Sequence, residues 1–150
     1  MNLYLSSFTN RIDKKGRVSV PATFRAVLGK EESPGVYASP SVRHPCLECC
    51  GPNYFKKLHS MIEAMDPFSP ERDAFATMVF GETSLLGVDG EGRIGIPQQL
   101  IDYAHLREEV LFVGKGATFE IWDQHAYQDY RKAARSRVQQ AFYNGEVPFL

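Results

Sequence analysis

The chain has 150 residues, 43% of them hydrophobic, which is enough for one folded domain or two small halves. Its formal net charge of −1 argues, on its own, against a nucleic-acid-binding protein. The sequence holds no run of about 18 apolar residues that could span a membrane, and its N-terminus lacks a signal-peptide pattern, so it predicts a cytoplasmic protein.

The charges are unevenly distributed along the chain. Residues 1–30 hold six bases and one acid, a net charge of +5, whereas residues 31–150 hold eleven bases and seventeen acids, a net charge of −6. A local basic surface can bind phosphate even when the whole protein is close to neutral. The alternative, from charge alone, is a solvated turn flanked by ordinary surface lysines.

The first element in chain order is a ten-residue frame that occurs twice. "IDKKGRVSVP" spans residues 12–21, and "VDGEGRIGIP" spans residues 88–97. The shared residues lie 76 positions apart (89 − 13 = 76), and they are Asp13 and Asp89, Gly16 and Gly92, Arg17 and Arg93, and Pro21 and Pro97.

Each frame predicts strand, turn, strand, proline and short helix. Aspartate first and glycine fourth are the preferences of a type I turn. In the strand that follows, alternation places Arg17 and Ser19 on one face, and Val18 and Val20 on the other face, toward a core. The proline suits the first position of a helix, because the N–H that it lacks has no partner there.

The remaining elements also occur in two sets. Strands are expected at residues 35–39 and 46–50 in the first half, and at 109–114 and 118–123 in the second, and a helix follows each pair. Between the halves, Ser69 is a candidate N-cap and Gly81 a candidate end for a connecting helix. The predicted organisation is a first half at 1–66, a connecting region at 67–82, a second half at 83–138 and a C-terminal tail at 139–150. Two such copies suggest a pseudo-two-fold α+β fold in which two β-hairpins pair or interleave.

Three cysteines, Cys46, Cys49 and Cys50, lie close together near His44. A zinc site would show a second pair of ligands at defined spacing, and the sequence offers none. We therefore expect a buried strand that uses cysteine as a small apolar residue, with no metal and no cofactor. The histidines are scattered and no nucleophile or phosphate-binding motif is present, so the sequence does not predict an enzyme.

The repeated aspartate and arginine have two interpretations. A structural ion pair that clips the turn explains Asp13, Gly16 and Arg17 in both copies. It does not explain Arg11, Lys14, Lys15 and Arg25, which add like charge around the first copy alone. An arginine on a rigid two-stranded ribbon can also reach a phosphate or a guanine edge.

The pattern "DKKGRVSVP" and "DGEGRIGIP", with "HPCLE" in the first half and "FEIWD" in the second, resembles the MraZ family of bacterial regulators linked to the division and cell-wall gene cluster. The stretch "MVFGETSLLGVDGEGRIGIP" is also similar to that family's passage into its second half. The resemblance runs from about residue 5 to residue 138.

The resemblance implies a duplicated swapped-hairpin fold of the AbrB/SpoVT type and subunits assembled into a ring homo-oligomer. It also implies a nucleoid-associated transcription factor that binds double-stranded DNA at direct repeats upstream of its own operon. Because Gly90 and Glu91 replace the two lysines in the second copy, we expect the first copy to be the main contact. The expected DNA contacts are Lys14, Lys15, Arg17, Arg93 and Arg11, and the expected turn-forming residues are Asp13, Gly16, Asp89 and Gly92.

A second hypothesis belongs to another class, a scaffold protein that uses its hairpins for protein contacts. It would use the apolar faces together with exposed aromatic side chains at Tyr4, Phe8 and Phe149.

Overall fold

A computed structural model describes residues 2–32 and 35–149, so the predicted end points at residues 1 and 150 lie outside the described part. The described chain is an α+β protein. Its strands are β1 Ser7–Arg11, β2 Arg17–Ser19, β3 Val36–Pro40, β4 Leu47–Cys50, β5 Ser84–Leu86, β6 Arg93–Gly95, β7 Glu109–Gly114 and β8 Phe119–Asp123. Its helices are α1 Ala22–Leu28, α2 Pro52–Glu63, α3 Pro70–Glu82, α4 Gln98–Tyr103 and α5 Gln124–Tyr143.

The strands form two sheets with approximate two-fold symmetry. A six-stranded sheet has the order β1-β7-β8-β4-β3-β5, and β2 pairs with β6 in a separate two-stranded ribbon. The series β1, β2, α1, β3, β4, α2 matches β5, β6, α4, β7, β8, α5, so the large sheet keeps its order when the halves are exchanged. Val18 faces Ile94 at the centre of the ribbon, and Glu48 faces Glu120 at the centre of the sheet. This arrangement confirms the predicted duplicated fold.

The strands on either side of each turn pair with the opposite half. β1 pairs with β7 and β5 pairs with β3, while β2 and β6 pair with each other, all antiparallel. The two frames are therefore interleaved and do not form two local hairpins. The exchange is favourable because each half alone has too little apolar surface for a core, whereas the interleaved strands share one.

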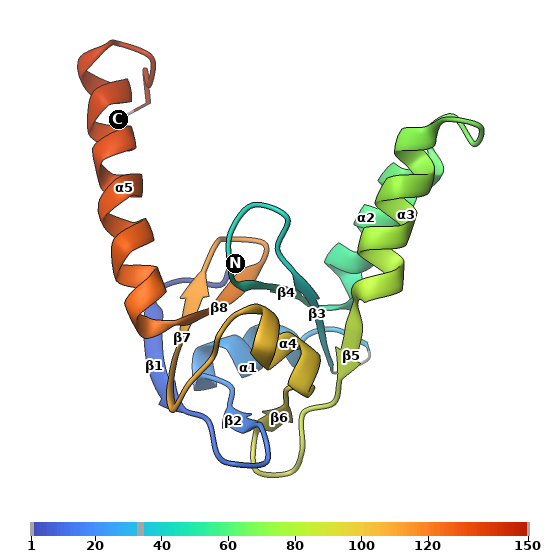
Figure 1. Cartoon of the computed structure of the whole chain (residues 1–150), viewed down its shortest axis with the longest axis vertical. Helices are drawn as coiled ribbons and strands as arrows, with labels where there is room; N and C mark the ends of the chain where they lie inside the picture. The colour runs from blue at the N-terminus through green and yellow to red at the C-terminus, as the bar shows by residue number, and fades with distance from the viewer. Residues whose placement is uncertain (1, 33–34, 150) are drawn as a thin grey trace.

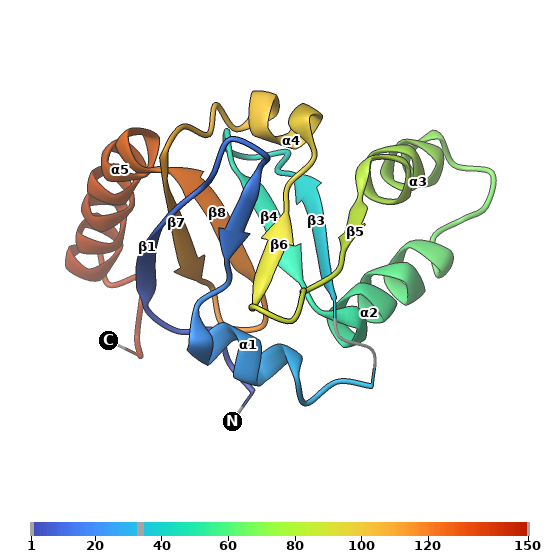
Figure 2. The same cartoon turned by 90° about the horizontal axis from the view of Figure 1, so that it is seen from below.

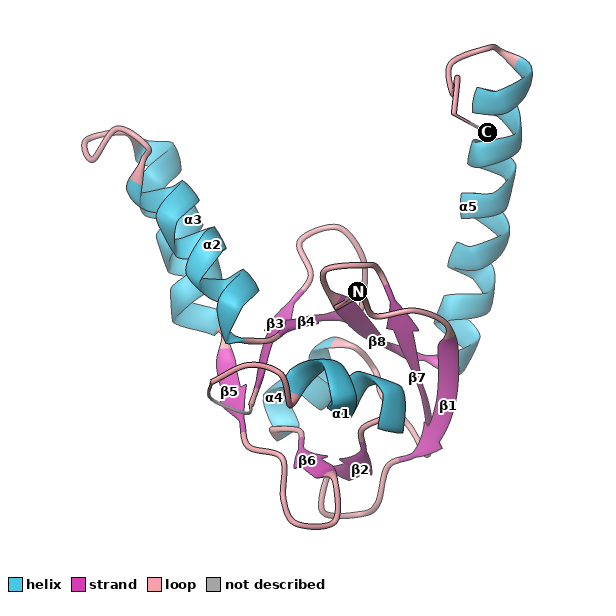
Figure 3. Cartoon of the chain, turned by 180° about the vertical axis from the view of Figure 1, so that it is seen from behind, coloured by secondary structure: helices cyan, strands magenta, loops and turns pink. Residues whose placement is uncertain are grey.

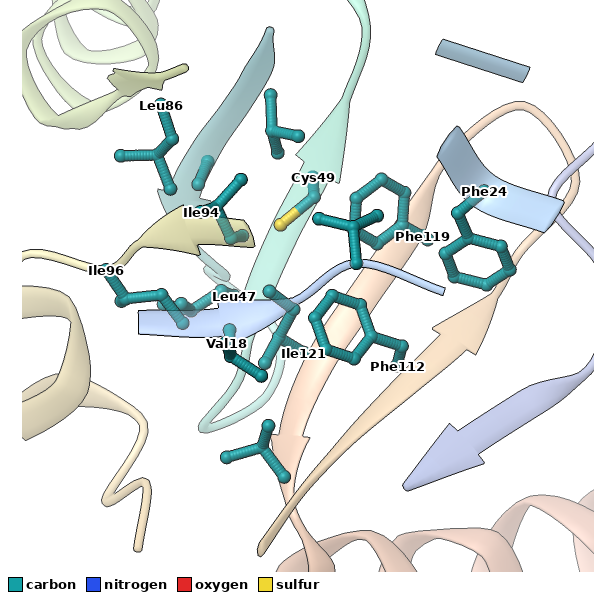
Figure 4. Close-up of a cluster of buried hydrophobic side chains, with 14 of the residues drawn as sticks. Val18, Phe24, Leu47, Cys49, Leu86, Ile94, Ile96, Phe112, Phe119 and Ile121 are labelled. Carbon is teal, nitrogen blue, oxygen red and sulfur yellow. The ribbon is translucent and has the colours of Figure 1, made fainter. Parts of the chain in front are cut away.

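That shared core lies between the large sheet and a layer made by the ribbon, α1 and α4 (Figures 1 and 3). Phe24 of α1 is fully buried and contacts the rings of Tyr4, Phe8, Phe112 and Phe119, with centroids 5.0–6.4 Å apart. Figure 4 shows Val18 and Ile94 of the ribbon pointing into the same cluster as Phe112 and Phe119 of the sheet. The apolar alternation of both frames thus faces this core, as predicted.

The cysteines are buried in and beside β4. Cys49 and Cys50 belong to the strand, Cys46 precedes it, and all three are free thiols. Burial raises the pKa of each thiol, for Cys50 to about 12. Cys49 and Cys50 serve as apolar strand residues, as the sequence predicts, whereas Cys46 is buried just before the strand begins.

Two helical arms project from the large sheet, on the side opposite the ribbon (Figure 1). One arm is the α2–α3 pair. Ser69 caps α3 by accepting the N–H of Arg72, as predicted, but the helix includes Gly81 and ends at Glu82. The other arm is α5, which runs to Tyr143 and so extends into the predicted tail at 139–150. Among the described residues, no helix is long and apolar enough to cross a membrane.

Candidate nucleic-acid interface

The first turn, residues 13–16, is organised by one carboxylate. Asp13 Oδ1 accepts the backbone N–H groups of Lys15 and Arg17, each at 2.9 Å, and Oδ2 accepts Nε of Arg17 at 2.9 Å. Gly16 closes the turn by donating its N–H to the Asp13 carbonyl at 3.0 Å, with a φ of 81° that favours glycine. The turn presents its two lysines to solvent.

The second turn, residues 89–92, repeats this geometry. Asp89 Oδ1 accepts the N–H groups of Glu91 and Arg93, Oδ2 accepts Nε of Arg93 at 3.1 Å, and Gly92 has a φ of 79°. The ion-pair clip is therefore present in both copies, as the structural interpretation requires. It occupies only Nε of each arginine, so it is compatible with a contact through the outer nitrogens.

These hydrogen bonds also fix the charge of the two carboxylates. The N–H of Arg17 is the main cause that lowers the pKa of Asp13, and the N–H of Arg93 does the same for Asp89. Each aspartate is therefore ionised at neutral pH and remains a hydrogen-bond acceptor for its turn.

Each turn is also tied to the opposite half. The Gly16 carbonyl accepts the N–H of Ile96 at 2.8 Å, and the Gly92 carbonyl accepts the N–H of Val20 at 2.9 Å. A Cβ at Gly16 would come within 2.7 Å of the Ile96 carbonyl oxygen, so this position requires glycine for contact as well as for φ. The turns are thus held by the interleaved fold and not only by local bonds.

The ribbon places its two arginines on one face. Arg17 lies opposite Gly95 and Arg93 lies opposite Ser19, so the arginines are roughly 7 Å apart along the strands. Because β2 and β6 are antiparallel and each follows its own turn, the two turns lie at opposite ends of the ribbon (Figure 2). We call this surface, the ribbon with both turns, the platform.

The platform is chemically asymmetric. Lys14 and Lys15 extend from the first turn, and Arg17 contacts a single carboxylate. At the second turn, Arg93 contacts Asp89 through Nε at 3.1 Å and Glu91 through Nη2 at 3.5 Å. The structure thus brings four of the predicted contacts to one surface and makes the first turn the more basic one.

Two further bases come from elements outside the ribbon and its turns. Arg11 ends β1, where its exposed guanidinium lies 3.7 Å from Glu108, so a carboxylate offsets its charge. Arg25, which the sequence groups with the first copy, lies against Gly92 of the second turn. Sequence reasoning missed this placement, because Arg25 reaches the second turn only through the exchange of strands between halves.

The aromatic side chains of the scaffold hypothesis are mostly not exposed. Tyr4 is buried against Phe24, and Phe8 is half-buried on the same core, which leaves Phe149 as the exposed member of the set. The expectation that Tyr4 and Phe8 form an exposed docking surface is wrong, because both are needed to complete the aromatic core.

Within the described residues, no group of three or more His, Cys, Asp or Glu side chains could hold a metal ion.

Comparison with known proteins identifies the family. The family described as "MraZ protein, putative antitoxin-like" matches residues 79–142. Proteins named "Transcriptional regulator MraZ" from Rickettsia rickettsii (strain Sheila Smith) and Rickettsia africae (strain ESF-5) are 54% and 53% identical over 135 residues. These alignments cover 90% of this chain and 91% of each relative.

The chain belongs to the MraZ family. The MraZ family match covers the second frame and most of α5, whereas the Rickettsia relatives align with 90% of the chain and so include residues of both halves. The first frame, which carries the lysines, is recognised as the counterpart of the matched one by its spacing of 76 residues.

Proposed function

We propose that this protein is a transcriptional regulator that binds double-stranded DNA through the platform, and that it acts by binding and not by catalysis. The observation that carries the proposal is the basic first turn, with Lys14 and Lys15 exposed and Arg17 clipped beside them on a rigid ribbon. A two-stranded ribbon fits the major groove, and its cations can neutralise backbone phosphates. The names of the Rickettsia relatives support the regulatory role.

The proposed target is a set of direct repeats in the promoter of the protein's own operon, in the division and cell-wall cluster, as the family resemblance implies. A single platform offers few cations, so its affinity for DNA should be modest. Several platforms on one ring would bind repeated DNA boxes more tightly through effective concentration, without any new type of contact.

The helical arms support assembly into a ring of identical subunits. The α2–α3 arm, residues 52–82, holds three Lys or Arg and five Asp or Glu, a net charge of −2, whereas α5 holds four Lys or Arg and one Asp, a net charge of +3. Both arms expose large apolar side chains, namely Met61, Phe68, Phe75 and Met78 on one, and Val138, Phe142 and Tyr143 on the other. Oppositely charged apolar surfaces favour a head-to-tail contact between copies, and such contacts form a ring when the rotation between neighbouring copies closes.

DNA recovered by selection from a random pool with the full-length protein tests the target. We expect a repeated box, and an affinity that falls steeply with salt because phosphate contacts release counterions. An affinity that stays flat between 50 and 200 mM salt would contradict the electrostatic basis of the proposal.

Arg17→Ala tests the role of the first turn. We expect about tenfold or greater loss of binding to the selected DNA, with an unchanged elution volume in size-exclusion chromatography. Arg43→Ala is the matched control, because Arg43 is exposed, pairs with Glu48 and belongs to the loop between β3 and β4, which lies on the side of the large sheet away from the ribbon (Figure 1). If Arg17→Ala dissociates the oligomer, the arginine is a structural clip and not a DNA contact.

A further inference from the structure

The second turn lacks a free cation of its own. Gly90 and Glu91 stand where the first turn has lysines, and the Arg93 guanidinium is engaged by two carboxylates, Asp89 and Glu91. A cation held by two acids attracts a phosphate less strongly than a free cation, because the phosphate is repelled by both acids. If this end of the platform binds DNA, the cation must come from another part of the fold.

Arg25 of α1 supplies a cation at this position. The place that a Cβ on Gly92 would take is 2.9 Å from Cζ, Nε and Nη1 of Arg25, so the guanidinium lies directly against the glycine backbone. Its Nε donates to the Val20 carbonyl at 3.1 Å, which orients the group. Arg25 is exposed, and it forms no ion pair with any carboxylate of the residues that the structure describes.

The opposite end of the platform is built differently. The residue that corresponds to Arg25 is Ile101 of α4, and its Cδ1 lies 3.3 Å from the place of a Cβ on Gly16. Figure 2 shows this crossed arrangement, in which the turn of each half lies next to the short helix of the other half. The first turn therefore carries its own lysines and packs against the apolar side chain of Ile101. The second turn is acidic and packs against the cationic side chain of Arg25.

We propose that Arg25 is the phosphate-binding cation of the second turn, and that its ligand is a backbone phosphate of the DNA on the platform. The inference rests on the proposed function and deepens it. With Nε bound to Val20, the Nη groups form the free edge of a planar fork that suits two phosphate oxygens. Gly92 leaves room for the fork, because the Cβ of any other residue would displace the Arg25 guanidinium. Arg93, in contrast, mainly holds its turn together.

The test measures DNA affinity as a function of salt for full-length variants. The probes are a duplex selected with the wild-type protein and a random-sequence duplex of equal length. Arg25→Gln should bind both duplexes about tenfold more weakly, since a phosphate contact is independent of sequence. Raising the salt from 50 to 200 mM lowers the affinity of the wild type by a certain factor. For Arg25→Gln, this factor should be about 3- to 4-fold smaller for each subunit that binds the DNA, because one counterion fewer is released. Arg25→Lys should restore part of the affinity because it keeps the charge.

Arg43→Gln is the control that removes the same charge from the exposed loop between β3 and β4, away from the platform. The proposal is overturned if Arg25→Gln matches the wild type in affinity and salt slope while Lys14→Gln weakens binding, a result that leaves the proposed function intact. It is also overturned if Arg93→Gln weakens binding more than Arg25→Gln at an unchanged unfolding midpoint. A wild-type protein that binds neither duplex at 50 mM salt would refute the proposed function itself.

Discussion

The two turn glycines have almost the same φ but different neighbours, so the same substitution should cost different amounts. In Gly16→Ala, the positive φ costs about 1–2 kcal/mol. The new Cβ also meets the Ile96 carbonyl oxygen at 2.7 Å, and such overpacking costs about 1–3 kcal/mol more. Because the obstacle is backbone in the interleaved ribbon, it cannot rotate away. The two costs add to about 2–5 kcal/mol, and we take about 3 kcal/mol as the expected total.

In Gly92→Ala, the obstacle is the Arg25 side chain, which can move. Only the φ cost of about 1–2 kcal/mol remains. Gly90→Ala is the matched control, because it has no neighbour within 4 Å and should change stability by less than about 0.5 kcal/mol.

Thermal unfolding followed by circular dichroism, at one fixed protein concentration, compares the three variants. For a chain of this length, 1 kcal/mol corresponds to about 2–4 °C, so Gly16→Ala should lower the midpoint by about 6–12 °C and Gly92→Ala by about 2–8 °C. Equal shifts for Gly16→Ala and Gly92→Ala would refute the reasoning that the Ile96 carbonyl constrains the first turn.

Two further predictions concern titration and thiol chemistry. The lowered pKa values of Asp13 and Asp89 mean that their contribution to stability is complete above the unfolded pKa, near 4, and is lost as the pH falls through the folded values. The double variant Asp13→Asn/Asp89→Asn should therefore lose less stability than the wild type between pH 5 and 2. Acid unfolding curves of the wild type and the double variant that superimpose would contradict this. Cys49 and Cys50 are buried with raised pKa values, so an aromatic disulfide reagent should label them slowly at pH 8 in the native protein and rapidly in denaturant. Rapid labelling of the native protein would show that β4 opens.

The sequence predicted the local parts of the platform well. Asp13 and Gly16 favour a turn by their own chemistry, and Val18 beside Arg17 defines the two faces of a strand, so neighbouring residues alone are enough to predict these features. Their recurrence after 76 residues then predicted two related halves.

The features that sequence reasoning missed depend on contacts between the halves. Arg25 looked like part of the first basic cluster, because it is close to Lys14 in the chain, yet the exchange of strands carries it to the second turn. Tyr4 looked like an exposed terminal aromatic, but its backbone pairs with Gly116 and its ring packs on Phe119. Neither contact has a local signal, since each joins residues that are far apart in sequence.

The joining of both frames in one chain has a consequence for the proposed DNA binding. A DNA-binding protein made of two identical halves has a true two-fold axis, and its DNA site is therefore palindromic. Here, the axis between Val18 and Ile94 relates a lysine-bearing turn to an acidic one, so a platform that binds DNA as we propose would have a direction along the duplex. A platform of this kind would distinguish a DNA sequence from its inverted copy. A ring of such platforms would therefore bind copies of one sequence in the same orientation, as in direct repeats.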